Sequence, residues 1–262
     1  MNPILQSLRY ALLGAALLVS TASAQEAAPS ARDLAAKLSA IIQNGSSVIR
    51  LKMEIRQPGS GGKTVLQIQV KSQRTKDSTE LVYQILWPKE RKGESFLLRK
   101  SGDAAPVGTL FTPPNSMVPL TAAKMKDGVF GSDLSYDDLV ENFFTWGNQA
   151  IVGTETVDRI PCQIMESKPG KGDSTGYAKV RSWIDTKRMV TLRVEKYAAS
   201  GKLAKRIDTT RVSRDDSSKI GSSFLLQRPG QDSVTDIDGS NSKHGMTFTA
   251  GDFTPEALRT LK

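Results

Sequence analysis

Serines and aspartates gather in one short stretch near the middle of the chain, FGSDLSYDDLVENFF, which covers residues 130–144. Carboxylates beside serine hydroxyls can support general acid–base catalysis or hold a metal ion. The same residue types also begin ordinary helices, because a hydroxyl accepts hydrogen bonds from free backbone amides and acidic side chains complement the helix dipole. The chemistry of this stretch therefore depends on the partners that the rest of the chain supplies.

The usual partner of a catalytic serine is a histidine, and the chain has one, His244, in the segment SKHGM. Hydrolytic triads and zinc sites need histidine with partners close by. The sequence contains no H-E-x-x-H or paired-cysteine spacing, and its one G-x-S-x-G match, GDSTG at residues 172–176, lies in the expected hairpin loop GKGDSTG. We interpret His244 as a surface strand or turn residue, and we expect no catalytic residue and no enzyme activity.

Residues 236–241, DIDGSN, resemble the start of a calcium loop, but no glutamate follows at the required spacing. Asp, Asn and Gly are also the preferred residues of tight turns, so we expect a turn, no metal and no cofactor. The single cysteine, Cys162, cannot form an internal disulfide. Its strand-like surroundings, RIPCQIM, favour a small apolar filler over a reactive thiol.

The opening stretch is better explained as the start of a helix of about ten residues. Ser135 is the expected N-cap, and Asp137 and Asp138 complement the positive end of the helix dipole. Leu134 and Leu139 occupy the positions of a hydrophobic staple. The apolar stripe comprises Tyr136, Leu139, Val140, Phe143 and Phe144. Because so short a helix is unstable alone, it either completes the core or covers a cavity for an apolar ligand.

From residue 46 onward the apolar pattern has the period of β-strands. Leu66, Ile68 and Val70 alternate with glutamines, so one face of this strand is expected to be dry and the other wet. About ten strands separated by turn residues predict a large antiparallel sheet that curls on itself. Besides the central helix, short helices are expected after Ser30, burying Leu34, Leu38, Ile41 and Ile42, and near the C-terminus from Thr254. With no internal repeat or linker, residues 25–262 are expected to form a single domain.

The N-terminus has the three parts of a secretory signal peptide. Arg9 supplies the positive region, residues 10–19 the apolar run, and the sequence up to Ala24 a small-residue cleavage pattern. We expect cleavage after Ala24 and export to the periplasm. The net charge is +9, or +8 once Arg9 is removed. This charge suits an anionic membrane surface or acidic lipid head groups, and an exported protein rarely meets nucleic acid.

Four segments resemble the outer-membrane lipoprotein-sorting family of LolA-like carriers. They are ILWPKERKGESFLLR (85–99), FGSDLSYDDL (130–139), VRSWIDTKRM (180–189) and YAASGKLAKRI (197–207). The resemblance spans roughly residues 46–212 and implies a mainly β fold of the LolA/LolB type. In such a fold an incomplete, strongly curved antiparallel β-barrel encloses an apolar cavity that accepts acyl chains, and a few helices cover its open side. Related proteins are linked to exporters of the resistance-nodulation-division type, and others are sensors of envelope stress.

The predicted function is an exported periplasmic carrier that holds the acyl chains of a lipoprotein or lipid under a helical lid and serves such an exporter. The alternative is a periplasmic regulatory or sensor module that binds a protein partner on the same scaffold. Expected partners are acyl chains, an inner-membrane exporter or an anionic membrane surface, with no nucleic acid, and the protein is expected to be a monomer. The residues expected to line the cavity and lid are Leu66, Ile68, Val70, Leu81, Tyr83, Ile85, Phe96, Leu98, Phe130, Leu139, Phe143 and Trp146.

Overall fold

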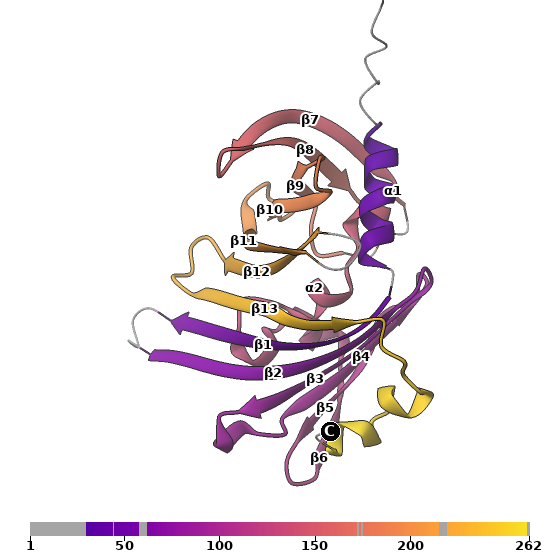
Figure 1. The fold of residues 1–262 in the computed structure, drawn as a ribbon, viewed down its shortest axis with the longest axis vertical. Helices are drawn as coiled ribbons and strands as arrows, with labels where there is room; N and C mark the ends of the chain where they lie inside the picture. The colour runs from indigo at the N-terminus through magenta and orange to yellow at the C-terminus, as the bar shows by residue number, and fades with distance from the viewer. Residues whose placement is uncertain are drawn as a thin grey trace, which may run out of the picture.

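One antiparallel sheet dominates the protein (Figure 1). The computed structural model describes residues 30–43, 45–57, 62–171, 173, 175–214 and 219–260, and the predicted signal peptide, residues 1–24, lies outside them. Within these ranges thirteen strands are hydrogen-bonded in the order β6-β5-β4-β3-β2-β1-β13-β12-β11-β10-β9-β8-β7. The strands are β1 (Gly45–Gln57), β2 (Gly62–Arg74), β3 (Ser78–Trp87), β4 (Ser95–Ser101), β5 (Val107–Thr112), β6 (Ser116–Leu120), β7 (Asn148–Val157), β8 (Ile160–Lys168), β9 (Lys179–Asp185), β10 (Val190–Tyr197), β11 (Leu203–Arg214), β12 (Lys219–Gln227) and β13 (Val234–His244).

The sheet is a strongly curved, incomplete barrel, which confirms the expected fold class. Its edge strands, β6 and β7, do not pair with each other in the described part of the chain. Bulges interrupt the register at several places, including the β1–β13 and β9–β10 pairs, and bulges bend and twist a sheet locally. The sequence pattern underestimates the strand number because β5 and β6 are short and half exposed, so their apolar alternation is weak.

Residues 236–241 are part of β13, which corrects the expected turn. They pair with β1, and the register shifts opposite Gly239. A Cβ at Gly239 would lie 3.2 Å from the carbonyl oxygen of Ser222, so the glycine permits a close approach of two strands. Among the described residues no group of three or more His, Cys, Asp or Glu side chains could hold a metal ion. His244 ends the same strand, exposed, with its Nε2 3.1 Å from the hydroxyl of Ser242, as expected for a surface residue.

The chain passes from one edge of the sheet to the other through residues 121–147, here called the crossing segment. It contains η2 (Ala122–Lys126), η3 (Val129–Gly131), α2 (Tyr136–Val140) and η4 (Phe143–Thr145). Figure 1 shows α2 inside the curve of the sheet and α1 (Ala31–Ile42) beside β7. The turns η5 (Ala250–Phe253) and η6 (Glu256–Arg259) contact β3 and β4, where Phe253 and Leu258 join an apolar cluster with Val82 and Leu97.

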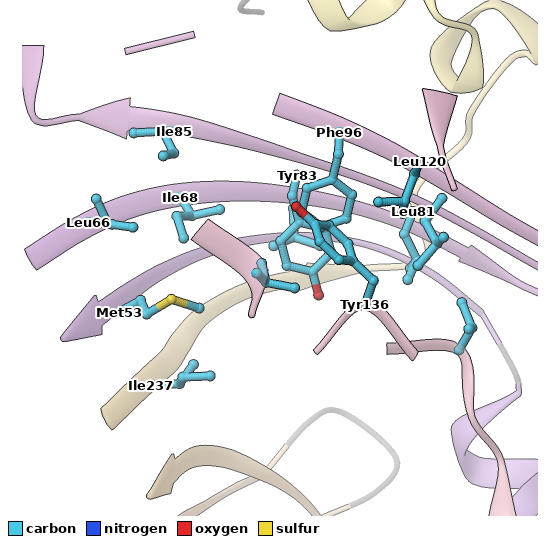
Figure 2. Packing of buried hydrophobic residues seen from close by; sticks show 14 of the residues in the cluster. Met53, Leu66, Ile68, Leu81, Tyr83, Ile85, Phe96, Leu120, Tyr136 and Ile237 are labelled. Atoms are coloured by element: carbon cyan, nitrogen blue, oxygen red, sulfur yellow. The ribbon is translucent and has the colours of Figure 1, made fainter. Parts of the chain in front are cut away.

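The main apolar core lies between β1–β4 and the crossing segment. Tyr83 and Phe96 stack with ring centroids 4.8 Å apart, and Tyr136 of α2 meets Phe96 edge-on at 4.9 Å (Figure 2). Val140 of α2 packs in the same cluster at 4% exposure. The short α2 therefore gains its stability from packing on the sheet, as a helix of this length requires.

Two expected helices differ from the sequence pattern. The central helix has five residues, Tyr136–Val140, because the chain becomes extended at Glu141 before the separate turn η4. In α1 the N-cap Ser30 accepts a hydrogen bond from the Asp33 amide, as expected, and Leu34 and Leu38 are buried. Ile41 and Ile42, expected to be buried with them, are exposed at 37% and 39%. Among the described helices, none has the length and apolar character needed to cross a membrane.

Candidate functional site

The first turn of α2 is built as the sequence predicts. Ser135 and Asp138 form a capping box, in which the Ser135 amide donates to Asp138 Oδ2 at 2.8 Å and the Ser135 hydroxyl donates to the same oxygen at 2.7 Å. Leu134 and Leu139, the expected staple, both pack against the main apolar cluster. These serine and aspartate side chains therefore organise a helix start.

Asp138 is also the centre of a buried charge cluster, which the sequence pattern does not predict. Lys196 of β10 donates from Nζ to Asp138 Oδ1 at 2.8 Å and to Glu141 Oε2 at 2.6 Å. Lys205 of β11 donates to Asp138 Oδ2. The side chains of Asp138, Lys196 and Lys205 are exposed by 2%, 3% and 4%. Two strands in the second half of the sheet thus hold the first turn of α2.

The cluster is made of charged groups. Burial alone would raise the pKa of Asp138, but Lys196 and Lys205 outweigh burial and hold this pKa well below its ordinary value. Burial alone would lower the pKa of Lys196, but Asp138 and Glu141 raise it above its ordinary value. Lys205 behaves differently, because burial lowers its pKa despite the attraction of Asp138. Its neighbours Lys196 and Arg228 act in the same direction as burial.

A second carboxylate, Asp133, attaches the crossing segment to β13. Asp133 is 3% exposed and accepts hydrogen bonds from the hydroxyls of Ser233 at 2.6 Å and Thr235 at 2.8 Å. Its amide donates back to Thr235 Oγ1 at 2.9 Å. Arg228 donates from Nη2 to the Asp133 carbonyl oxygen at 3.2 Å. The motif G-S-D-L-S-Y-D-D thus has two deeply buried aspartates, Asp133 and Asp138. Asp133 attaches this short segment to β13, and Asp138 attaches it to β10 and β11.

Arg74, at the end of β2, is a third attachment. It donates from Nη2 to the carbonyl oxygen of Leu139 at 2.8 Å and from Nη1 to Thr79 Oγ1 at 3.4 Å. The last carbonyl groups of a helix lack partners within the helix and carry its negative dipole end, so a guanidinium is favoured there. Burial lowers the pKa of Arg74. In the described part of the chain it forms no ion pair, so α2 is its main partner.

A cavity of about 1340 Å³ lies beside this segment. Its apolar side includes alanines of α1 with Val140, Phe144 and Trp146, and its polar side includes Lys205 and Arg228. Exposed residues 76–77 and 102–103 lie at its margin, so it is open to solvent. Ligand pockets for small molecules usually have about 300–1,000 Å³. This cavity is therefore large enough for a ligand of lipid size.

Asn142 connects the cavity wall to α1. Its Nδ2 donates to the hydroxyl of Ser39 at 2.9 Å, and Asn142 is 8% exposed. Its Oδ1 is buried and has no hydrogen-bond partner. Leu34 and Leu38 of α1 also pack in an apolar cluster with Phe144, Met165 and Ile184. The helix is thus held beside the cavity by this cluster, by contacts with β7 and by the Asn142 side chain of the crossing segment.

The twelve predicted lining residues lie in several places. Eight from β2–β4 are packed in the main apolar cluster at 9% exposure or less: Leu66, Ile68, Val70, Leu81, Tyr83, Ile85, Phe96 and Leu98. Phe130 and Leu139 are partly buried against that cluster, and Phe143 packs with the α1 cluster. Of the twelve, Trp146 alone borders the 1340 Å³ cavity. The space directly beneath α2 is thus filled by side chains, and the role of these residues in ligand binding stays a prediction.

The polar side of the site has a weak sequence signal. Lys196 and Lys205 stand in strands where alternation with apolar residues marks inward positions, but a lysine is normally exposed. Their position opposite each other on β10 and β11 is visible only in the strand register, where Lys196 lies opposite Lys205.

The single cysteine agrees with the sequence interpretation. Cys162 is a buried free thiol at 2% exposure, and burial raises its pKa.

Comparisons with solved structures find the same fold in three bacterial proteins. A DUF1329 family protein from Desulfovibrio piger matches with a TM-score of 0.80 and 22% identity over 87% of this chain and 97% of that chain. A domain described as an outer membrane lipoprotein-sorting protein domain, from Vibrio parahaemolyticus, matches with a TM-score of 0.77 and 18% identity over 87% and 98%. A LolA superfamily protein from Nitrosomonas europaea matches with a TM-score of 0.68 and 18% identity over 88% and 100%.

Sequence comparisons add the family. No curated protein is significantly similar to the chain. A family model with the description "Uncharacterized protein" matches residues 76–260, which is more than half of the chain. The chain therefore belongs to that family, and its fold is the one found in LolA-like, outer-membrane lipoprotein-sorting proteins.

Proposed function

We propose that the protein is an exported periplasmic carrier that holds the acyl chains of a lipid or lipoprotein on the concave side of its sheet. The observation that supports this most is the combination of an apolar concave face, a crossing segment held by polar attachments, and a cavity of about 1340 Å³ beside them. An acyl chain gains roughly 0.8 kcal/mol for each methylene removed from water, so such a surface suffices to hold one. The fold similarity to lipoprotein-sorting domains agrees with this role.

The structure corresponds to a closed form in this proposal. The surface that would receive acyl chains beneath α2 is filled by Tyr136 and Val140, so full loading requires the crossing segment to move. An acyl chain that replaces these side chains buries apolar surface in their place, which offsets the loss of their own burial. The polar attachments through Asp133, Asp138 and Arg74 then decide how readily the segment opens.

Location and partners belong to the same proposal. The signal peptide would direct the mature chain, beginning at Gln25, to the periplasm. There the protein would act as a monomer. Cargo would come from an inner-membrane exporter of the resistance-nodulation-division type or from an anionic membrane surface, to which the net charge of +8 of the mature chain is suited. N-terminal sequencing of the periplasmic protein tests the cleavage after Ala24.

Lipid analysis of the protein purified from an envelope fraction tests the carrier function directly. Mass spectrometry of an organic extract should detect lipid bound at a defined ratio, and a hydrophobic fluorescent probe should bind the delipidated protein and be displaced by fatty acid. The control is the same protein unfolded and refolded without detergent or lipid. It should bind the probe at full stoichiometry, because no lipid is left to compete. Absence of both co-purified lipid and probe binding refutes the proposal.

A second candidate function, a regulatory or sensor module that binds a protein partner, has one observation in its favour. The interior beneath α2 is close-packed, as expected of a scaffold without cargo. Cross-linking in intact cells separates the two functions. A single stable protein partner together with no bound lipid supports the sensor module, whereas bound lipid supports the carrier.

A further inference from the structure

We propose that Lys205 and Arg228 form a subsite for the anionic, phosphate-type head group of an amphiphile whose chain lies along the apolar side of the cavity. This inference rests on the proposed carrier function and names the class of its ligand. Both residues lie on the wall of the 1340 Å³ cavity. They come from different elements, β11 and the turn after β12, and Arg228 lies near enough to Lys205 to help lower its pKa.

Lys205 has less compensation than its neighbour Lys196. Lys196 Nζ binds two carboxylates, those of Asp138 and Glu141. In the described part of the chain, the hydrogen-bond partner of Lys205 Nζ is one oxygen, Asp138 Oδ2, which already accepts two hydrogen bonds from Ser135. An ammonium has three donors, so Lys205, which borders the cavity, retains donors beyond the one that binds Asp138.

Arg228 has one long ion pair, with Asp133. Its Nε and Nη2 donate to the backbone carbonyl oxygen of Asp133 at 3.4 and 3.2 Å. The nearest Asp133 carboxylate oxygen lies 3.6 Å from Nε and already accepts the Ser233 hydroxyl. The Arg228 side chain is 27% exposed, so its guanidinium is accessible from the cavity. A planar guanidinium beside an ammonium is the usual combination for a phosphate group.

The charges around this point favour an added anion. The repulsion from Lys196 and Arg228 that helps to lower the pKa of Lys205 would be relieved by a negative head group. Glu141 and Asp137 are the acidic residues of the crossing segment that line the cavity. Glu141 is paired with Lys196 and accepts the Thr175 hydroxyl at 2.5 Å, and burial together with Glu141 raises the pKa of Asp137.

The other side of the cavity fits the chain of the same molecule. Ala35, Ala36 and Ala40 of α1 line it together with Phe144 and Trp146. Small side chains on α1 leave room along the helix, and the two aromatic side chains provide apolar contact area. A ligand with an acyl chain and a negative head group therefore matches both sides of the cavity.

The test compares two probes with the same myristoyl chain, the anionic lysophosphatidylglycerol and the neutral monoacylglycerol, both below their micellar concentrations. Inorganic phosphate is the third probe. Isothermal titration of the mature protein should show that the anionic lipid binds about tenfold more tightly than the neutral one, as expected for charge-assisted hydrogen bonds. Arg228→Gln and Lys205→Gln should each reduce this preference, which is the ratio of the two affinities and is unaffected by any change in opening that both lipids share. Binding of the neutral lipid also reports that the variant is folded. Lys243→Gln, at an exposed lysine of β13, is the matched control and should keep the preference.

Each other result has a separate meaning. Equal affinities for the two lipids, or a preference that survives Arg228→Gln, would overturn the subsite while the carrier function stands. If phosphate binds and both lipids fail, the residues form a site for free phosphate, and both the amphiphile and the carrier proposals are wrong. If none of the three probes binds, both proposals are likewise wrong.

Discussion

Replacement of Lys196 by methionine tests the central charge cluster. The change preserves most of the side-chain volume but leaves Asp138 and Glu141 without their shared ammonium in a place where Lys196 and Asp138 are only 3% and 2% exposed. Removing one partner of a buried ion pair costs about 3–5 kcal/mol, because the remaining charge is left uncompensated. Solvent screening does not reduce this figure, since neither group is accessible.

The expected loss can be measured by urea unfolding, which gives the free energy, and by thermal unfolding of the mature protein at pH 7. A domain of this size loses about 2–4 °C in melting temperature per kcal/mol, so Lys196→Met should melt about 6–20 °C lower than the unmodified protein. The control is Lys168→Met, which removes a lysine that pairs with Glu166 at 2.9 Å but is 55% exposed. Exposed pairs contribute about 0–1 kcal/mol, so this variant should be nearly neutral. A loss below about 1 kcal/mol for Lys196→Met would refute a stabilising role for the cluster.

Three further outcomes follow from other contacts. Arg74→Gln removes the donor to the Leu139 carbonyl, so hydrogen exchange at residues 136–140 should accelerate about tenfold; unchanged exchange would show that α2 does not depend on Arg74. Asp138 has a lowered pKa in the folded protein, so its contribution to stability is present above the unfolded pKa of about 3.9 and is lost as the pH falls through the lower folded pKa. Asp138→Asn should therefore be less stable than the unmodified protein at pH 7 and should lose less stability on acidification. Parallel acid-unfolding curves of the two proteins would contradict this. Cys162 is 2% exposed and its pKa is raised by burial, so a thiol reagent at pH 8 should label it at the rate of unfolding, whereas immediate labelling of the folded protein would show an open site.

Much of the fold follows from local patterns in the sequence. Alternation in segments such as Leu66–Val70 identifies strands with one buried face, and the capping box of Ser135 and Asp138 marks the start of α2. Turn residues separate the strands clearly enough to predict a single antiparallel sheet. These features depend on residues that are close together in the sequence, so they can be predicted from the sequence alone.

The site depends on contacts between distant segments and is harder to predict. Asp138 meets Lys196 and Lys205 only because α2 lies inside the curve of the sheet. The predicted length of α2 is wrong for the same reason. The apolar stripe continues to Phe144, but the helix ends at Val140, and Asn142 binds Ser39 of α1 instead of continuing the helix. Ile41 and Ile42 continue the apolar pattern of α1 but stand at its C-terminal end and are exposed.

The sheet order also constrains how the protein folds. Because β1 pairs with both β2 and β13, one of its ladders is local and the other joins residues near positions 47 and 244. Strands β1–β6 can pair through successive hairpins before the rest of the chain has emerged. The sheet cannot be completed until the last strand, β13, is present. The lysines that hold α2 also come from β10 and β11, after the crossing segment in sequence. Until the C-terminal half arrives, the segment that covers the apolar face of β1–β4 lacks the ion pairs that hold it, so the partly folded chain is prone to aggregate during that interval.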